Sequence, residues 1–465
     1  MNERDVEAMF VRLSKLESGK RQYTDTSNAE RLLEKYGKDI RYCPEWNQWL
    51  CWDGKRWRKG KAVEMHARAK QIVRDMYGEA CRAESEWERE ELEKHAFKCE
   101  GLHRRKAMVE ALSWEQPVWI SPEELDRDIW LLNCGNGTVD LRTGELRPHD
   151  RNDYITKIAS ADYVRDADCP RWKRFLSEVM GGNESLVSFL QRAGGCALTG
   201  STKEQKLFVL HGSGANGKST FLSTLLNLLG EYGVGARSET FMHRPGRDMS
   251  NDIARLMGSR LVATSEAEKG SRLSENLVKQ MTGNDRLTAR FLYGEYFDFV
   301  PTFKIFMATN HRPTVEGTDD AMWRRIKLIP FEVTIPDGRQ DQDLLESLEE
   351  EYSGILNWLV EGCLAWQREG LGAPEAVKKA TKAYRNEMDV VGRFVADRCE
   401  TGSGLETKSR ELFTAFNAWC AQKHERAGSE RLLAFRLRDL GYEKKRRKDA
   451  HYWLGIGLRK ATGSR

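Results

Sequence analysis

Eight residues near the middle of the chain have the types and spacing of a phosphate-binding loop. They run from Gly212 to Ser219 in the pattern G-x-x-x-x-G-K-[ST], and an apolar stretch at 207–210 precedes them. An amphipathic run at 221–229 follows, which completes the strand, loop and helix that the pattern requires. In such a loop, backbone N–H groups and the helix N-terminus surround a triphosphate. The sequence therefore predicts a site for a nucleoside triphosphate.

The side chains of this loop have separate tasks. Lys218 is expected to pair with the β- and γ-phosphate oxygens, and the hydroxyl of Ser219 is expected to complete the coordination shell of Mg²⁺. ATP and Mg²⁺ are therefore the expected cofactors. The residues expected to contact the nucleotide are Gly212, Gly214, Asn216, Gly217, Lys218, Ser219 and Thr220.

Two apolar segments downstream end in polar residues that suit hydrolysis. The first, 260–265, leads into Glu266 and Glu268, and a carboxylate at such a strand end is where Mg²⁺ and the attacking water are handled. Glu266 is the candidate for polarising the water and binding the metal, and Glu268 would assist. Which of the two is the principal group stays open. The second segment ends at Asn310, whose amide would orient the water or sense the γ-phosphate.

Residues 287–299 predict a β-hairpin, because a period-two pattern is followed by an aromatic-rich run with Gly294 between them. Cations beside aromatic side chains on a projecting hairpin suit a phosphate backbone with stackable bases. A hairpin that packs its aromatics into the core is the alternative. The candidate DNA-contacting residues of this region are Lys279, Arg286, Arg290, Tyr293 and Lys304.

Two adjacent arginines, Arg324 and Arg325, precede an apolar segment at 326–331. One or both could reach the nucleotide of a neighbouring subunit as an arginine finger. Such a group stabilises charge on the transferred phosphoryl and is worth about 10³–10⁵-fold in rate. Ordinary surface charge ahead of a strand is the alternative.

The composition bounds the class of protein. For 465 residues, a prior of about 100–200 residues per domain predicts three or four domains. No apolar run approaches the ~18 residues of a membrane span, and the N-terminus is charged where a signal peptide is apolar. We therefore expect no membrane association and a cytoplasmic location. The ten cysteines include no C-x-x-C pair, which is typical of reduced thiols.

One cluster has the residue types of a metal site. His95, Cys99 and His103 recur every four residues and could share a helix face, with Cys81 as the nearest further ligand. Half-buried or solvated helix residues are the favoured interpretation, because a structural metal needs a complete set of ligands.

The C-terminal part of the chain is basic. Residues 385–465 contain 18 Lys or Arg and 11 Asp or Glu, a balance of +7 that leaves the first 384 residues at −3. Helical patterns at 409–426 and 430–440 precede a strand, a charged turn and a strand at 441–456, which together predict a winged helix.

The second of these helices, with Arg431, Arg436 and Arg438, would approach a DNA groove, and the charged turn would lie on phosphate. A partner-binding winged helix or a solvated charge run is the alternative. The candidate DNA-contacting residues of this module are Arg436, Lys444, Lys445, Arg446 and Arg447.

Taken in order, the phosphate loop, acidic strand end, basic hairpin and Asn-tipped strand resemble a superfamily 3 helicase. More closely, they are similar to the helicase portion of phage and plasmid replication proteins of the satellite-phage primase–helicase family, which is related to the poxvirus primase–helicase. The matching stretches are 212–220, 265–268, 277–285, 304–310 and 323–325, with 46–57, 131–138 and 144–149 upstream.

The resemblance implies a multidomain α/β protein with an AAA+-type P-loop NTPase core. The implied domains are an α+β pre-helicase domain at 1–165, a helical collar or linker at 166–200, the core at 201–335, a helical lid and connector at 336–384, and the winged helix at 385–465.

The resemblance also implies an activity and partners. A ring, expected to be a homo-hexamer, would hydrolyse ATP between subunits and move 3′→5′ on single-stranded or forked DNA during replication of a phage, prophage or plasmid. Many relatives carry a primase–polymerase domain ahead of this region. Here the residues before the loop are filled by the pre-helicase match, so we expect a separate primase.

Two other functions use the same loop. A small-molecule P-loop kinase would need a lid and an acceptor pocket, but neither a basic hairpin nor a DNA-binding tail. An ATP-gated protein that assembles on an origin without processive unwinding would use the same residues as a helicase. The sequence leaves this second alternative open.

Overall fold

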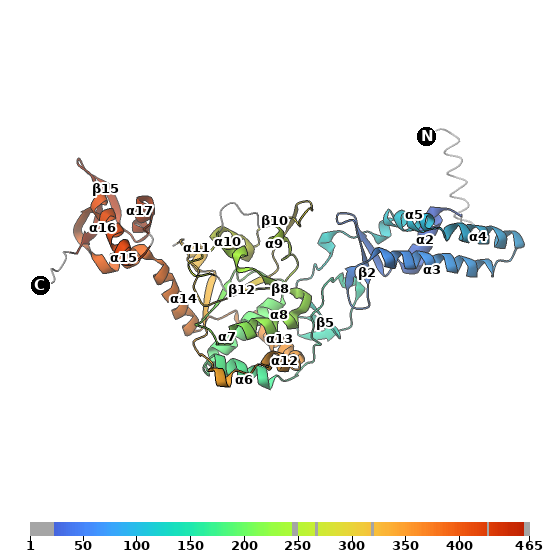
Figure 1. Cartoon of the computed structure of the whole chain (residues 1–465), viewed down its shortest axis with the longest axis horizontal. Coiled ribbons are helices and arrows are strands. Elements are labelled where there is room, and N and C mark those ends of the chain that lie inside the picture. The colour runs from blue at the N-terminus through green and yellow to red at the C-terminus, as the bar shows by residue number, and fades with distance from the viewer. Residues whose placement is uncertain (1–22, 244–249, 266–267, 318–319, 426, 460–465) are drawn as a thin grey trace. The chain divides into compact units, whose positions relative to one another are not determined.

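The computed structural model describes residues 23–243, 250–265, 268–317, 320–425 and 427–459. The chain divides into two compact units, one of Met1–Val139 with Leu146–Ile158 and the other of Asp140–Glu145 with Ala159–Arg465. Figure 1 labels the elements of both units. Among the described residues, no helix has the length and apolar character needed to cross a membrane.

The first unit combines packed helices with small sheets, in agreement with the predicted α+β N-terminal region. Its helices bury a shared apolar core that includes Leu32, Met65, Ile72 and Leu112. The sheets have the strand orders β1-β2-β3 and β4-β5-β6. The elements are α2 (Asp25–Tyr36), β1 (Ile40–Cys43), β2 (Gln48–Trp52), β3 (Trp57–Lys59), α3 (Ala62–Ala80), α4 (Glu86–Cys99), α5 (Leu102–Ser113), β4 (Leu131–Cys134), β5 (Gly137–Asp140) and β6 (Glu145–Arg147).

The His/Cys cluster of α4 packs against α2. Cys99 is buried, and its sulfur accepts a hydrogen bond from Nδ2 of Asn28 at 3.4 Å. The Asn28 Oδ1 atom lies 2.9 Å from Nε2 of His95, while His103 is exposed on α5. Within the described ranges, no group of three or more His, Cys, Asp or Glu could hold a metal ion.

A five-stranded parallel sheet forms the centre of the second unit, with the order β13-β7-β12-β9-β8. Figure 1 labels two of its strands, β12 and β8. The strands are β7 (Leu207–His211), β8 (Gly233–Ala236), β9 (Leu261–Thr264), β12 (Lys304–Thr309) and β13 (Ile326–Pro330). Every residue of β9 and β12 is buried, as expected for parallel strands covered on both faces. Since β12 lies between β7 and β9, the phosphate loop, Asn310 and the acidic segment follow neighbouring strand ends.

Helices precede, connect and follow these strands in the sequence. They are α6 (Pro170–Val179), α7 (Glu184–Leu198), α8 (Lys218–Leu229), α9 (Ser250–Ala254), α10 (Glu275–Thr282), α11 (Asp320–Trp323), α12 (Leu344–Glu349), α13 (Tyr352–Glu369) and α14 (Glu375–Met388). The predicted boundary at residue 385 falls inside α14. This helix belongs with the sheet, because Tyr384 is part of the apolar core on that side and Thr381 Oγ1 accepts a hydrogen bond from the Leu328 N–H.

The predicted hairpin at 287–299 is confirmed. Its strands β10 (Leu287–Ala289) and β11 (Phe297–Phe299) pair antiparallel, with Leu287 opposite Phe299. The neighbouring α9 braces the connection, since Ser250 Oγ accepts from the Arg290 N–H and Asn251 Oδ1 from the Leu292 N–H.

After α14 the chain forms a small module with its own core, in which Phe394, Phe416, Leu437 and Trp453 are buried. Its three-stranded sheet has the order β14-β16-β15, so the first strand pairs with the last. The elements are α15 (Val390–Arg398), β14 (Cys399–Lys408), α16 (Ser409–Gln422), α17 (Glu430–Asp439), β15 (Glu443–Arg446) and β16 (His451–Leu458).

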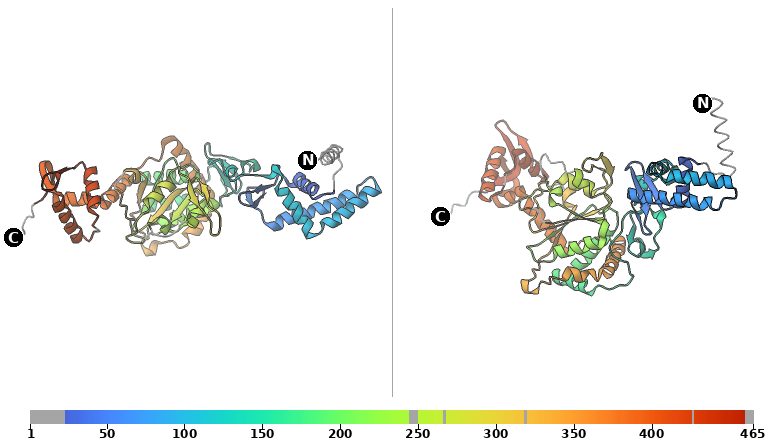
Figure 2. Two further views of the ribbon diagram at one scale, coloured as in Figure 1. Left: turned by 90° about the horizontal axis from the view of Figure 1, so that it is seen from above. Right: turned by 45° about the vertical axis from the view of Figure 1, so that its right-hand side comes forward.

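Helices α7 and α13 lie side by side although they are far apart in the sequence (Figure 1 and Figure 2). Glycines allow this approach. A Cβ atom on Gly195 would lie 2.1 Å from the Cys363 backbone nitrogen, and one on Gly362 would lie 2.2 Å from the Gln191 carbonyl oxygen. These neighbours are backbone atoms that cannot turn aside, so the two helices are held in direct backbone contact.

We expect Gly195→Ala to destabilise the protein by about 1–3 kcal/mol, because the added methyl group forces the helices apart. Gly235→Ala in β8 is the matched control, since a methyl group at this position would have no other atom within 4 Å. Urea denaturation of both variants measures the difference. Equal midpoints for the two variants would contradict the close helix contact.

Candidate functional site

The phosphate loop connects the end of β7 to the start of α8. Its backbone has positive φ angles at Gly214 (112°), Ala215 (46°) and Gly217 (82°), a conformation that glycine adopts without strain. A Cβ on Gly212 would lie 2.1 Å from the carbonyl oxygen of Phe331, so this position needs glycine for a close backbone approach. Nothing lies within 4 Å of a Cβ on Gly214. The loop therefore lies against the Phe331 backbone at Gly212 and has free space beside Gly214.

Lys218 lies at the centre of this site and is only 5% exposed. Its Nζ atom donates hydrogen bonds to the Gly212 carbonyl oxygen (2.9 Å), to Asn216 Oδ1 (2.7 Å) and to Asn310 Oδ1 (3.0 Å). Asn216 is fixed in turn, because its Nδ2 donates to the Phe331 carbonyl at 3.1 Å. The structure thus brings Lys218 and Asn310 together although they were predicted from separate segments.

The other predicted polar residues lie around this centre. Ser219 is exposed and Thr220 half-buried in the first turn of α8, so both hydroxyls are near the loop. Glu268 is exposed after the end of β9. Glu266, the candidate for polarising the water and binding the metal, lies outside the described residues.

The two arginines before β13 have different environments. Arg325 is 8% exposed, and its guanidinium donates to Thr282 Oγ1 (3.2 Å) and to the Ala321 carbonyl oxygen (2.6 Å). Arg324 is exposed and donates to Gln205 Oε1 at 3.1 Å. Arg325 therefore joins α10 to α11 inside its own subunit, and Arg324 is the one of the pair that faces outward.

The hairpin presents aromatic and basic side chains to solvent. Tyr293 at its tip is 99% exposed, and Phe291, Leu292 and Tyr296 are also exposed. The Arg290 guanidinium lies over the Tyr296 ring, 4.7 Å from its centroid. Arg286 is exposed as well, whereas Lys279 is half-buried on α10. The alternative in which these aromatics fill the core does not hold at the tip.

The prediction that Lys304 contacts DNA is wrong. Lys304 is 4% exposed, and its ammonium group donates to the carbonyl oxygens of Thr199, Ser201 and Thr302. Two of these carbonyls directly follow α7, whose C-terminus carries partial negative charge and attracts a cation. Burial lowers the pKa of Lys304 to about 8. Its role is to fix the start of β12 against the end of α7.

Arg436 is also committed within the protein rather than to DNA. Its guanidinium forms a two-pronged contact with Asp389, through Nε at 3.2 Å and Nη2 at 2.7 Å. The side chains of this pair are 15% and 16% exposed. Lys444 is half-buried, with its ammonium 5.7 Å from the centroid of Trp453. On α17 and the β15–β16 hairpin, the exposed basic side chains are instead Arg431, Arg438, Lys445, Arg446, Arg447 and Lys448.

Sequence reasoning missed a cavity of 480 Å³ beside the phosphate loop. Phe175 of α6, Gly217 of the loop and Ile335 after β13 are among the residues that line it. The Ile335 N–H donates to the Ala215 carbonyl at 2.7 Å, which fastens this later segment to the loop. The apolar pattern of 170–179 identifies a helix, but nothing in the sequence pairs that helix with a segment more than 150 positions later.

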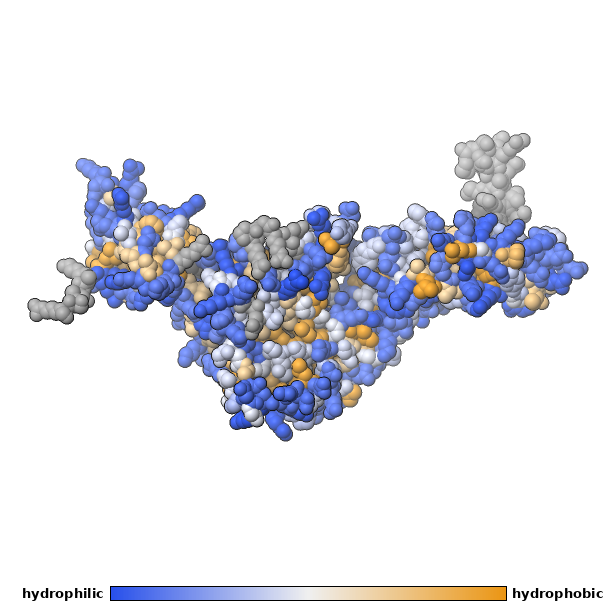
Figure 3. All heavy atoms as spheres, in the orientation of Figure 1, coloured by the Kyte–Doolittle hydropathy of each residue, from blue (hydrophilic) through white to orange (hydrophobic). Residues whose placement is uncertain are grey.

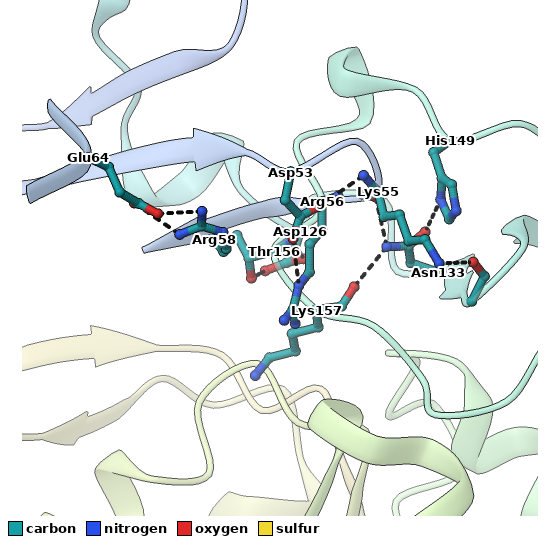
Figure 4. A network of polar contacts seen from close by, with 11 residues as sticks. Asp53, Lys55, Arg56, Arg58, Glu64, Asp126, Asn133, His149, Thr156 and Lys157 are labelled. Atoms are coloured by element: carbon teal, nitrogen blue, oxygen red, sulfur yellow. Dashed lines mark hydrogen bonds and ion pairs between the residues drawn. The ribbon is translucent and has the colours of Figure 1, made fainter. Parts of the chain in front are cut away.

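A buried asparagine organises the polar network of the first unit (Figure 4). Asn133 Nδ2 donates to the carbonyl oxygens of Lys55 (3.0 Å) and Lys157 (3.1 Å). Its Oδ1 accepts from Thr138 Oγ1 (3.1 Å) and lies 2.8 Å from Nδ1 of His149. All of its hydrogen-bonding groups are used, so the motifs at 131–138 and 144–149 have a structural role here.

Two family models match this chain. Residues 29–181 match the family described as D5 N terminal like, and residues 210–325 match a family of unknown function, DUF5906. The first range contains the predicted upstream motifs, and the second runs from the phosphate loop to Arg325.

The chain is also similar in sequence to viral proteins. It is 30% identical to "Putative helicase L207/L206" of Acanthamoeba polyphaga mimivirus, over 59% of this chain and 31% of that protein. It is 26% identical to "Putative helicase 022R" of Frog virus 3, over 61% and 30% respectively, and 23% identical to "Putative primase C962R" of African swine fever virus, over 64% and 34%. These matches support a D5-like primase–helicase family. The chain spans about a third of the length of these relatives.

Two solved structures of the NrS-1 C-terminal region are similar to this chain. The apo structure of residues 305–718 has a TM-score of 0.43 at 10% identity, covering 64% of this chain and 77% of that one. An A-form apo structure has a TM-score of 0.38 at 13% identity, covering 51% and 56%.

We expect Lys304→Ala to lower the free energy of unfolding by about 2–4 kcal/mol, because it leaves a cavity and deprives buried carbonyls of their donor. Arg286→Ala removes an exposed cation and should change stability by no more than about 0.5 kcal/mol. Urea denaturation at pH 7 compares the two. If Lys304→Ala lowers the free energy of unfolding by less than about 1 kcal/mol, the ammonium group does not make these buried hydrogen bonds.

Proposed function

We propose that this chain is the ATP-hydrolysing motor of a superfamily 3 DNA helicase. The observation that carries the proposal is the hydrogen bond between Lys218 and Asn310, which joins a phosphate loop to the tip of the adjacent strand. A polar amide at that tip lies where a γ-phosphate and its attacking water would be. The relatives named helicase or primase support a role in replication.

In the proposed reaction, the oxygens that now surround Lys218 are replaced by β- and γ-phosphate oxygens. Asn310 then orients the attacking water, and Glu266 with Glu268 accepts its proton. The exposed hydroxyl of Ser219 fits a ligand of Mg²⁺. When bound, Mg²⁺ neutralises charge on the phosphates.

The cavity beside the loop suits the nucleoside end of ATP. It adjoins Gly217 and Thr220, so a nucleotide with its phosphates on the loop would extend into it. The ring of Phe175 offers an apolar surface, and Arg174 is an exposed cation of the same helix. A cavity of 480 Å³ is within the range of small-molecule sites.

The proposed motor is a homo-hexameric ring with an AAA+-type core. The strand order, with the Asn310 strand between the loop strand and the acidic strand, supports such a core. Arg324, which faces outward, is the proposed finger that reaches the nucleotide of the next subunit. Movement 3′→5′ on single-stranded or forked DNA and service to a phage, prophage or plasmid complete the proposal.

Two surfaces are proposed to contact DNA. The hairpin tip, with Arg286, Arg290 and Tyr293, would hold single-stranded DNA through phosphate contacts and base stacking. The C-terminal module contains a helix, a strand, two helices and a hairpin in this order, which supports a winged helix. On α17, Arg431 and Arg438 are exposed, and the end of the β15–β16 hairpin is hydrophilic (Figure 3). This module would bind duplex DNA, with α17 at a groove and the hairpin on phosphate.

An ATP-gated origin-binding protein remains the second candidate function. It would use the same loop and the same C-terminal module, but it would not couple hydrolysis to unwinding. No observation in the structure favours it over the motor.

We expect wild-type protein with ATP and Mg²⁺ to hydrolyse ATP faster when single-stranded DNA is added and to unwind a fork. Lys218→Ala and Glu266→Gln should each lower hydrolysis by about 100-fold or more, because they remove phosphate binding and water activation. Phosphate release and strand displacement measure the two activities. Hydrolysis that ignores DNA, with no unwinding, would reject the motor in favour of the origin-binding protein.

We expect Arg324→Ala to lower DNA-stimulated hydrolysis by about 10³-fold without loss of stability, as for other trans-acting arginines. Mixing this variant with Lys218→Ala should restore part of the activity, because each supplies what the other lacks. Arg325→Ala should chiefly lower the melting temperature. If mixing restores nothing, Arg324 does not act between subunits.

A further inference from the structure

One face of α14 holds the segment that follows Asn310. Tyr384 is buried there, and its hydroxyl donates a hydrogen bond to the Pro313 carbonyl oxygen. Its ring packs edge-on against Trp323, with centroids 5.2 Å apart and an interplanar angle of 82°. Pro313 lies three residues after Asn310, and Trp323 directly precedes Arg324. Tyr384 therefore contacts residues close in sequence to both of these candidate catalytic side chains.

Two ion pairs strengthen the same contact. Glu387 of α14 pairs with Arg312, two residues after Asn310. Arg385 pairs with Asp320 at 2.6 Å, at the start of the short helix α11 that leads to Arg324. A displacement of α14 would therefore act on both sides of this segment, at residues 312–313 and at 320–323.

The C-terminal module is attached at the end of α14 through Asp389. This carboxylate caps α15 by accepting from the Gly392 N–H at 2.9 Å, and it also receives the two-pronged contact of Arg436 from α17. The same guanidinium lines a small hollow with Val315 and Trp323, so α17 adjoins the segment that α14 holds. Contacts thus run from Arg436 of α17 through Asp389 and α14 to Arg312 and Pro313, which follow Asn310 in the sequence.

We propose that the Asp389–Arg436 pair is a positioning contact that couples duplex DNA on the C-terminal module to ATP hydrolysis. The proposal rests on the proposed function and adds a route of regulation to it. Duplex bound by the exposed arginines of α17 changes the position of that helix. The paired guanidinium passes the change to Asp389 and α14, and α14 passes it to Asn310 and Arg324. The hairpin is expected to act by a separate route, because α9 braces the connection between its strands through Ser250 and Asn251.

The test compares how strongly duplex and single-stranded DNA stimulate hydrolysis in full-length protein. The variants are Asp389→Asn, Arg436→Gln and the double variant, and Asn is chosen because it still caps a helix. We expect duplex stimulation to fall about fivefold or more in each single variant, a usual size for coupling between sites. The double variant should be no worse than either single one, as for residues that act as a pair. Basal hydrolysis and its stimulation by single-stranded DNA should each stay within about twofold of the wild-type value. This change is smaller than the expected loss of duplex stimulation.

Arg393→Gln is the matched control. Arg393 pairs with Glu425 at 2.8 Å inside the same module, but this ion pair does not lead to α14. We expect its loss to leave duplex stimulation unchanged. Tyr384→Phe tests the route from the other side, because it removes only the hydroxyl that reaches Pro313, and it should also weaken duplex stimulation.

The outcomes separate this proposal from the function on which it rests. A wild type that neither hydrolyses ATP nor binds DNA would reject the proposed function. A wild type that does both, with Arg436→Gln still fully stimulated by duplex, would overturn the coupling alone. Fluorescence anisotropy with a labelled duplex measures DNA binding directly. If Arg436→Gln no longer binds the duplex, Arg436 is part of the DNA-binding surface, and the coupling proposal is overturned. If Asp389→Asn and Arg436→Gln unfold, full stimulation of Tyr384→Phe would overturn the coupling.

Discussion

The candidate site depends on one buried ammonium group held between the phosphate loop and the residue that follows strand β12. Lys218 donates to oxygens of its own loop and to Asn310 of the next strand, so a single cation fixes the distance between loop and strand tip. A buried charge is tolerated only where polar groups surround it. The oxygens of Gly212, Asn216 and Asn310 thus stabilise the charge of this lysine in a site from which water is largely excluded.

Features that depend on a short stretch of sequence could be predicted. The phosphate loop, the hairpin around Gly294 and the apolar strands each lie within about a dozen residues, where patterns of period two and glycine spacing carry the information. The phosphate loop and Asn310 follow strands β7 and β12, which are parallel neighbours, so both lie at the same edge of the sheet. This neighbouring order brings Lys218 and Asn310 into contact.

Features that depend on distant partners could not be predicted. Lys304 and Arg436 look like surface cations in the sequence, but their partners lie 105 and 47 positions away. A lysine at the start of a buried strand is stable only because the end of α7 meets it there, and no local pattern identifies that meeting. The cavity beside the loop is another case, since it needs α6 and the segment after β13 together. The basic residues predicted to contact DNA are therefore of two kinds. Some, such as Lys304 and Arg436, hold segments of the protein together, and others are exposed.

The glycine contact between α7 and α13 also constrains how the chain is made. Gln191 and Trp358, which bond across this crossing, are 167 positions apart. During synthesis, the face of α7 that bears Gly194 and Gly195 has no partner until α13 has left the ribosome. Contacts of such long range fold slowly and leave apolar surface exposed in the meantime. The second unit therefore cannot complete its core until α13 has emerged.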